Sequence, residues 1–176
     1  MGLVHVYTGD GKGKTTAAFG LAMRALGHGI PVLVMQFLKG GGRLSGEAEF
    51  FRGAPGAELI CFPDQRHPMF CTKGECDLER LKASINDGFR LARDKVINGR
   101  YGLVVLDEVN NCMKAGWLAP EDVLSLIADK PENVELVLTG RGAPGEVIAA
   151  ADYVTEMRPV RHPADKGVTA LDGVEY

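Results

Sequence analysis

Length, composition and charge place the 176-residue chain among ordinary globular proteins: 45% of its residues are hydrophobic, 24% are charged, and the formal charge is −3. These values exclude disordered and fibrous classes, and the length suits one domain spanning residues 1–176. The small negative charge offers no general attraction to nucleic acid or to a membrane surface, so we expect neither as a partner. No apolar run of about 18 residues and no signal-peptide pattern occur, which predicts a cytoplasmic protein with reduced cysteines.

Apolar runs alternate with helical patterns along the chain, which predicts an α/β fold with a mostly parallel central sheet and helices on both faces. In the first half we expect strands at residues 3–8, 31–37 and 57–62, and a helix from Lys14 to about Leu26. The segment at 39–55, which is rich in glycine and arginine, is predicted as a loop, and a second loop is predicted at 63–76. The second loop is long for a compact domain, and such loops are often functional.

The second half begins with the clearest helix, at 77–98, which Asp77 can cap. Its apolar stripe at steps of three or four comprises Leu78, Leu81, Ile85, Phe89, Ala92 and Val96. Residues 102–107 form an apolar run that ends in a carboxylate, as in a buried parallel strand. A helix opened by Pro120 precedes strands at 134–139 and 152–157, and the tail from Arg158 shows no clear periodicity.

The segment after the first strand predicts a phosphate-binding loop. It comprises Gly9, Asp10, Gly11, Lys12, Gly13, Lys14, Thr15 and Thr16. In the usual pattern a glycine stands where Thr8 is found here, so the motif is a variant. Its glycines allow backbone N–H groups to form an anion nest, and the helix that follows directs its positive end at the same place. We expect this loop to hold the triphosphate of ATP, with Lys14 on phosphate oxygens and Thr15 on a metal ion.

An incidental glycine-rich turn is the alternative, but the strand–loop–helix context favours a nucleotide site. The motif leaves the reaction open, because kinases, ATPases, GTPases and other transferases share it.

Asp107 and Glu108 follow a predicted neighbouring strand and supply the acidic half of a metal–triphosphate site. We expect Asp107 to hold the metal directly or through water, and Glu108 to orient the metal shell or a substrate. The alternative is that the two carboxylates cap a short helix at residues 109–114.

Four stretches in this order resemble the P-loop ATP:corrinoid adenosyltransferases of vitamin B12 metabolism. They are GDGKGKTTAAFGLAMRALGHG, VVLDEVNN, LTGRGAP and the tail RPVRHPADKGVTALDGVEY. The resemblance runs over essentially the whole chain. It implies a RecA-like fold, a homodimer, and transfer of the 5′-deoxyadenosyl group of ATP to cobalt(I) of a reduced corrinoid. Triphosphate would leave, magnesium or manganese would assist, and a reductase would supply the cobalt(I).

Two further candidates, Arg141 and Lys12, follow from their positions in the sequence, and a third, Phe70, follows from the resemblance. Arg141, after the fifth predicted strand, is expected to contact phosphate or ribose, and Lys12 to contact phosphate; for both, a solvated surface side chain is the alternative. Phe70 is the candidate for packing against the corrin, the alternative being that it only pins its loop to the core. Relatives carry an N-terminal helix that helps to close the site, and this chain starts at its first strand.

Other possibilities stay open at this stage. His67, Cys71, Cys76 and the nearby Cys61 offer a weak zinc-ligand pattern, whereas Cys112 is expected to be a small buried hydrophobe. A conventional P-loop kinase or ATPase, and a non-catalytic carrier of corrinoid or nucleotide, are the alternative functions. The sequence does not identify the natural corrinoid.

Overall fold

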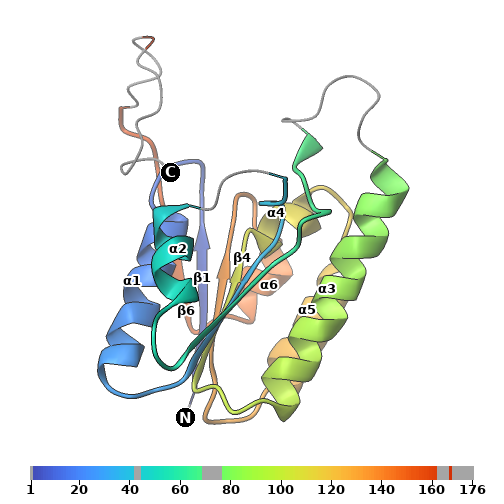
Figure 1. The fold of residues 1–176 in the computed structure, drawn as a ribbon. Helices are drawn as coiled ribbons and strands as arrows, with labels where there is room; N and C mark the ends of the chain where they lie inside the picture. The colour runs from blue at the N-terminus through green and yellow to red at the C-terminus, as the bar shows by residue number, and fades with distance from the viewer. Residues whose placement is uncertain (1, 42–44, 69–76, 162–166, 168–176) are drawn as a thin grey trace.

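The computed structural model describes residues 2–41, 45–68, 77–161 and 167, and its centre is a six-stranded sheet (Figure 1). The strand order is β3-β2-β4-β5-β1-β6, and every neighbouring pair is parallel. The strands are β1 (Val4–Thr8), β2 (Val32–Gln36), β3 (Ala57–Cys61), β4 (Leu103–Asp107), β5 (Glu135–Thr139) and β6 (Tyr153–Glu156). All lie where the sequence predicts strands, so the α/β prediction with a parallel sheet is confirmed.

Helices cover both faces of the sheet (Figure 1). One face carries α1 (Lys14–Gly27) and α2 (Gly46–Arg52). The opposite face carries α3 (Leu78–Asn98), α4 (Val109–Lys114), α5 (Pro120–Asp129) and α6 (Gly145–Ala149). None of the helices in the described part of the chain has the length and hydrophobicity needed to cross a membrane.

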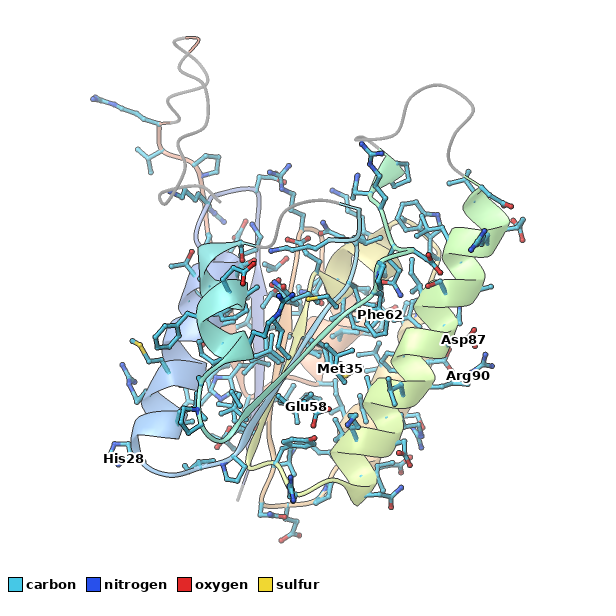
Figure 2. The ribbon with its side chains drawn as sticks, viewed as in Figure 1. His28, Met35, Glu58, Phe62, Asp87 and Arg90 are labelled. Atoms are coloured by element: carbon cyan, nitrogen blue, oxygen red, sulfur yellow. The ribbon has the colours of Figure 1, made fainter. Side chains whose placement is uncertain are left out.

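The central strands β2 and β4 are buried along their whole length, because helices pack on both of their faces. Alternate side chains therefore enter two separate cores. Val34 and Val105 pack toward α1 and α2, whereas Met35 and Leu106 pack toward α3 and its neighbours. Met35 is labelled between the sheet and α3 in Figure 2, which draws the side chains of both layers.

Helix α3 follows its predicted pattern at all but one position. The Asp77 side chain caps it by accepting hydrogen bonds from the N–H groups of Glu79 and Arg80. Of the predicted stripe, Leu81, Ile85, Phe89, Ala92 and Val96 are buried. Leu78, however, is 48% exposed, because the first turn projects beyond the sheet, and its inclusion in the stripe was wrong. The outer face carries the Asp87–Arg90 ion pair, which points into solvent in Figure 2.

Two short helices are not predicted by the sequence. The prediction that 39–55 is a loop is wrong for α2, which Ser45 caps by accepting a hydrogen bond from the Ala48 N–H. A tertiary contact explains why this seven-residue segment is helical, since the Phe51 ring packs edge-on against Phe19 of α1 at 4.8 Å. The five-residue helix α6 likewise buries Val147 against the core.

The carboxyl ends of the parallel strands share one edge of the sheet, toward which the β1 arrow points in Figure 1. Strand register brings particular residues together there. Gln36 at the end of β2 is the register partner of Asp107 at the end of β4, and Tyr7 of β1 is the partner of Thr139 of β5. Ligands of α/β folds collect at this edge.

Candidate functional site

The glycine-rich loop between β1 and α1 is pinned to the end of β6. The Gly11 N–H donates to the Met157 carbonyl oxygen at 2.7 Å, and a Cβ at Gly11 would lie 2.8 Å from that oxygen. Gly13 has φ of 110° and forms the N-cap of α1, a conformation that glycine adopts without strain. The Gly11 N–H is thus occupied by Met157 and does not join the anion nest in this structure, contrary to the prediction that successive N–H groups turn inward.

Lys14, at the first position of α1, folds its side chain back over the loop. Its Nζ donates to the carbonyl oxygens of Gly9 at 2.8 Å and Gly11 at 2.7 Å, and the residue is only 7% exposed. Burial lowers the pKa of Lys14, and the nearby Glu108 carboxylate opposes that shift. The loop therefore holds one partly desolvated ammonium group at its centre.

Asp107, at the end of β4, is the fully buried anion of the site, with 0% exposure. One carboxylate oxygen, Oδ1, accepts from the hydroxyls of Thr15 at 2.9 Å and Thr139 at 2.7 Å. The other, Oδ2, accepts from Gln36 Nε2 at 3.0 Å and lies 3.0 Å from Lys39 Nζ. Burial alone would raise the pKa of Asp107, but the Lys39 charge and these hydrogen bonds outweigh it and hold the pKa below its ordinary value.

Glu108 follows directly and is held in a left-handed conformation with φ of 65°. Burial and the adjacent Asp107 charge raise the pKa of Glu108 above its ordinary value. Glu108 occupies the N-cap position of α4, but its side chain makes no capping hydrogen bond and instead accepts one from the Asn111 amide. The alternative in which this carboxylate caps the helix is therefore wrong.

The turn after β5 is tied to the same helix. Asn111 Oδ1 accepts from the Arg141 N–H, and Asn110 Nδ2 lies 3.4 Å from the Gly140 carbonyl oxygen. Arg141 is exposed at this edge, and its charge adds to the effect of burial in lowering the pKa of Lys14 and opposes the rise in the pKa of Glu108. The backbone of Arg141 is thus fixed to α4, and its charge acts on Lys14 and Glu108.

The remaining loop residues lie toward solvent. Asp10, Lys12 and Thr16 are exposed, and the Thr16 hydroxyl lies 3.4 Å from the Glu47 carboxylate of α2.

Sequence reasoning missed three residues of the Asp107 environment: Gln36, Lys39 and Thr139. Each lies at or just after the carboxyl end of a strand that neighbours β4 or β5 in the sheet. Their position at a strand end is the signal that could have indicated them. Without the strand order, however, the sequence does not say which strand ends adjoin Asp107.

The donor set around Asp107 fits a hard divalent cation. Thr15 and Asp107 present a hydroxyl and a carboxylate oxygen 2.9 Å apart, and magnesium prefers such oxygen ligands. Lys39 already places a cation against the same two side chains, with Nζ 3.0 Å from Asp107 Oδ2 and 3.4 Å from Thr15 Oγ1. The site therefore attracts positive charge.

Comparison with known families and proteins gives this site its context. The family model "ATP:corrinoid adenosyltransferase BtuR/CobO/CobP" matches residues 1–176. The chain belongs to this family. A corrinoid adenosyltransferase of Pseudomonas aeruginosa is 40% identical over 99% of this chain and 84% of its own length. The corrinoid adenosyltransferase CobA of Salmonella typhimurium is 36% identical over 99% of this chain and 86% of its own length.

Among solved structures, a KaiC-like protein of Pyrococcus horikoshii matches with a TM-score of 0.56 and 19% identity. The match covers 88% of this chain and 71% of that chain. At this identity the likeness concerns the fold alone, and it agrees with the RecA-like architecture expected for the corrinoid adenosyltransferase family.

Several predicted residues lie outside the described part of the chain. They are Phe70, Cys71, Cys76 and most of the tail from His162. Of the weak zinc pattern, His67 and Cys61 are described, and burial lowers the pKa of His67. Within the described ranges no group of three or more His, Cys, Asp or Glu side chains is arranged to hold a metal ion. Cys112 is fully buried as expected, and burial raises the pKa of its thiol.

Proposed function

We propose that this chain transfers the 5′-deoxyadenosyl group of ATP to cobalt(I) of a reduced corrinoid and releases inorganic triphosphate. One observation carries the proposal: a P-loop with a buried lysine lies beside the hydrogen bond between Thr15 and the buried Asp107, in a chain that matches the ATP:corrinoid adenosyltransferase family over residues 1–176. The relatives named above support the same activity.

The reaction balances without a protein nucleophile or general base. Cobalt(I) contributes the electron pair of the new cobalt–carbon bond to C5′ of the ribose. The C5′–oxygen bond breaks, and triphosphate takes its electron pair. Two tasks remain for the protein: holding C5′ in line with cobalt, which can supply about 7–11 kcal/mol, and stabilising the charge on the departing triphosphate.

The residues of the loop suit the second task. Lys14 offers an ammonium group whose hydrogen-bond partners among the described residues are the Gly9 and Gly11 carbonyls, and phosphate oxygens can replace them. The N-terminus of α1 adds its positive end. We assign Gly9, Asp10, Gly11, Lys12, Gly13, Thr16 and Arg141 to ATP binding, and Lys14, Thr15 and Glu108 to catalysis.

Thr15, Asp107 and Glu108 would hold Mg²⁺ or Mn²⁺ together with the nucleotide. When bound, the ion would neutralise charge on the polyphosphate. Asp107 is suited to this role because four side-chain donors fix its carboxylate.

The corrinoid site is proposed on the resemblance. Phe70 is our candidate for the contact with the lower face of the corrin. We further propose a single catalytic domain, a homodimer, a cytoplasmic location and an electron-donating reductase as partner, as in the family.

The test combines protein, ATP, magnesium and chemically reduced cobalamin. We expect the spectrum of adenosyl–cobalt to appear with one triphosphate per adenosyl group, over more than one turnover per chain. Diphosphate and phosphate without adenosylcorrinoid would show a conventional kinase or ATPase instead. A single equivalent of bound nucleotide or corrinoid without turnover would indicate a carrier.

A further inference from the structure

Lys39 supplies a second, partly buried cation to the site, and neither the P-loop motif nor the acidic pair includes it. It follows β2 by three residues, and its Nζ lies 3.0 Å from Asp107 Oδ2 and 3.4 Å from Thr15 Oγ1. The Lys39 side chain is 31% exposed, whereas its partner Asp107 is fully buried. This ammonium group therefore contacts two of the three side chains that we assign to the metal ion, Asp107 and Thr15.

The backbone that presents Lys39 is strained and anchored. Leu38 has φ of 58°, and it and Glu108 are the two non-glycine residues with positive φ in the described part of the chain. Such conformations persist only where the surroundings enforce them, and they cluster at functional sites. Leu38 directly precedes Lys39, and Glu108 directly follows Asp107.

The anchor is Gln65, which is completely buried. Its side chain accepts from the Leu38 N–H at 3.4 Å and donates to the Ser84 carbonyl of α3 at 2.9 Å, and its own carbonyl accepts from the Gly40 N–H at 2.9 Å. Hydrogen bonds on both sides of Lys39 thus fix the turn to α3. The backbone of Lys39 is therefore fixed on both sides, through the N–H groups of Leu38 and Gly40.

We propose that Lys39 is a tethered counter-ion that occupies the cation position between Asp107 and Thr15 until the metal–nucleotide complex binds, and that it then moves onto the polyphosphate. The proposal deepens the proposed function and rests on its assignment of a metal–ATP site. A divalent ion and an ammonium group on the same buried carboxylate repel each other strongly, because like charges a few ångströms apart interact with little screening in such surroundings. The long, flexible lysine side chain can instead move to the negative charge of the bound polyphosphate.

The first measurement is metal binding by the protein without nucleotide, using free Mn²⁺ followed by electron paramagnetic resonance. Lys39→Met removes the competing charge and keeps an apolar stem. We expect it to bind Mn²⁺ about tenfold or more tightly than the natural protein, within the usual range of coupling between sites. An unchanged or weaker Mn²⁺ affinity would overturn the proposal.

The matched control is Lys95→Met. Lys95 is also partly covered, with 26% of its side chain exposed, and its Nζ lies 2.6 Å from a Glu58 carboxylate oxygen away from the site. The Lys95→Met variant should bind Mn²⁺ with the same affinity as the natural protein. A gain of affinity in both variants would show a general effect of lost positive charge and would also overturn the proposal.

The second measurement is binding of ATP in the presence of a chelator. Lys39→Met should bind it several-fold more weakly, because one cation that would move onto the phosphates is gone; equal affinity would refute the second half of the proposal. If the Lys39→Met variant unfolds at too low a temperature for titration, the change in Tm on adding magnesium replaces the titration. We expect magnesium to raise the Tm of the variant more than that of the natural protein. An equal rise in the two proteins would contradict the proposal. None of these readouts uses corrinoid, so they can fail while adenosyl transfer stands, or succeed while it fails.

Discussion

Gly11 marks the place where the P-loop touches the end of β6. A Cβ there would lie 2.8 Å from the Met157 carbonyl carbon and oxygen, which are backbone atoms and cannot rotate away. We predict that Gly11→Ala destabilises the protein by about 1–3 kcal/mol, as overpacking does, and weakens ATP binding because the loop must shift. Chemical denaturation and ATP titration measure the two effects.

Gly20→Ala is the control for that substitution. Gly20 is a solvent-facing residue of α1, and a Cβ there would meet nothing within 4 Å. Alanine is the better helix former, so the protein should become more stable by up to about 1 kcal/mol, with ATP affinity unchanged. If Gly11→Ala proved as harmless as Gly20→Ala, the contact with Met157 would not constrain the loop.

Lys14 is the residue on which the proposed stabilisation of triphosphate depends most. We predict that Lys14→Ala lowers the rate of adenosyl transfer about 10²–10³-fold, the usual cost of losing one donor to developing charge. Lys130→Ala removes another ammonium that donates to a backbone carbonyl, that of Gly2 at 2.6 Å. It should leave the rate nearly unchanged. Equal rates for both variants would mean that Lys14 does not hold the leaving group.

Among the secondary-structure elements, β3 and α3 are joined by a polar contact at the edge of the sheet. Glu58 of β3 accepts a hydrogen bond from Lys95 of α3 at 2.6 Å and another from the Tyr101 hydroxyl. These hydrogen bonds, that of Lys95 first, lower the pKa of Glu58 below its ordinary value of 4.5. The folded protein therefore favours the ionised carboxylate.

The sign of the pH effect follows from that lowered pKa. The contribution of Glu58 to stability is present above about pH 4.5, the ordinary value, and is lost as the pH falls through the lower folded-state pKa. The Glu58 side chain is 41% exposed, so solvent screening keeps the contribution to about 1 kcal/mol or less. We predict that Glu58→Gln lowers the Tm at neutral pH and that the difference vanishes in acid.

The exposed Glu79 of α3 provides the comparison, because its partner Lys82 is 3.8 Å away and its side chain is 87% exposed. Glu79→Gln should change the Tm less at neutral pH. A Glu58→Gln difference that persisted unchanged in acid would show that the effect is not ionic.

The elements also show how far the sequence alone could predict this fold. Helix α3 has a cap and a periodic apolar stripe, so its local signals agree with its final state. Helix α2 has only seven residues, two of them adjacent phenylalanines, and depends on Phe51 meeting Phe19. Contacts of that kind are set by the tertiary structure, and no window of sequence contains both partners.

At the scale of the whole molecule, the site joins strand ends that are distant in sequence. The P-loop and the Asp107–Glu108 pair could be predicted because each has a local motif. The neighbours of Asp107 could not, since Gln36, Lys39 and Thr139 become neighbours only through the order β2-β4-β5. A single buried carboxylate thereby connects β2, β4, β5 and the first turn of α1.

That connection predicts how ligands stabilise the entire fold. A ligand at about 100 times its Kd adds about 2.7 kcal/mol, which corresponds to a rise in Tm of about 5–10 °C for a protein of this size. We predict such a rise with magnesium and ATP together, and a smaller one with ATP alone, because the metal adds contacts to Asp107 and Thr15. Differential scanning calorimetry with each combination of ligands measures the effect.

Asp107→Asn tests whether the buried carboxylate carries the contribution of magnesium. The amide has the same shape without the charge, so the rise with ATP alone should remain and the additional rise with magnesium should disappear. Asp152→Asn is the control, since Asp152 accepts a hydrogen bond from the Val4 N–H at 2.7 Å near the start of β1, at the opposite edge of the sheet. It should keep the magnesium effect. If Asp107→Asn kept it as well, the metal ion would bind through the nucleotide alone, and the four donors around Asp107 would serve the fold and not the ligand.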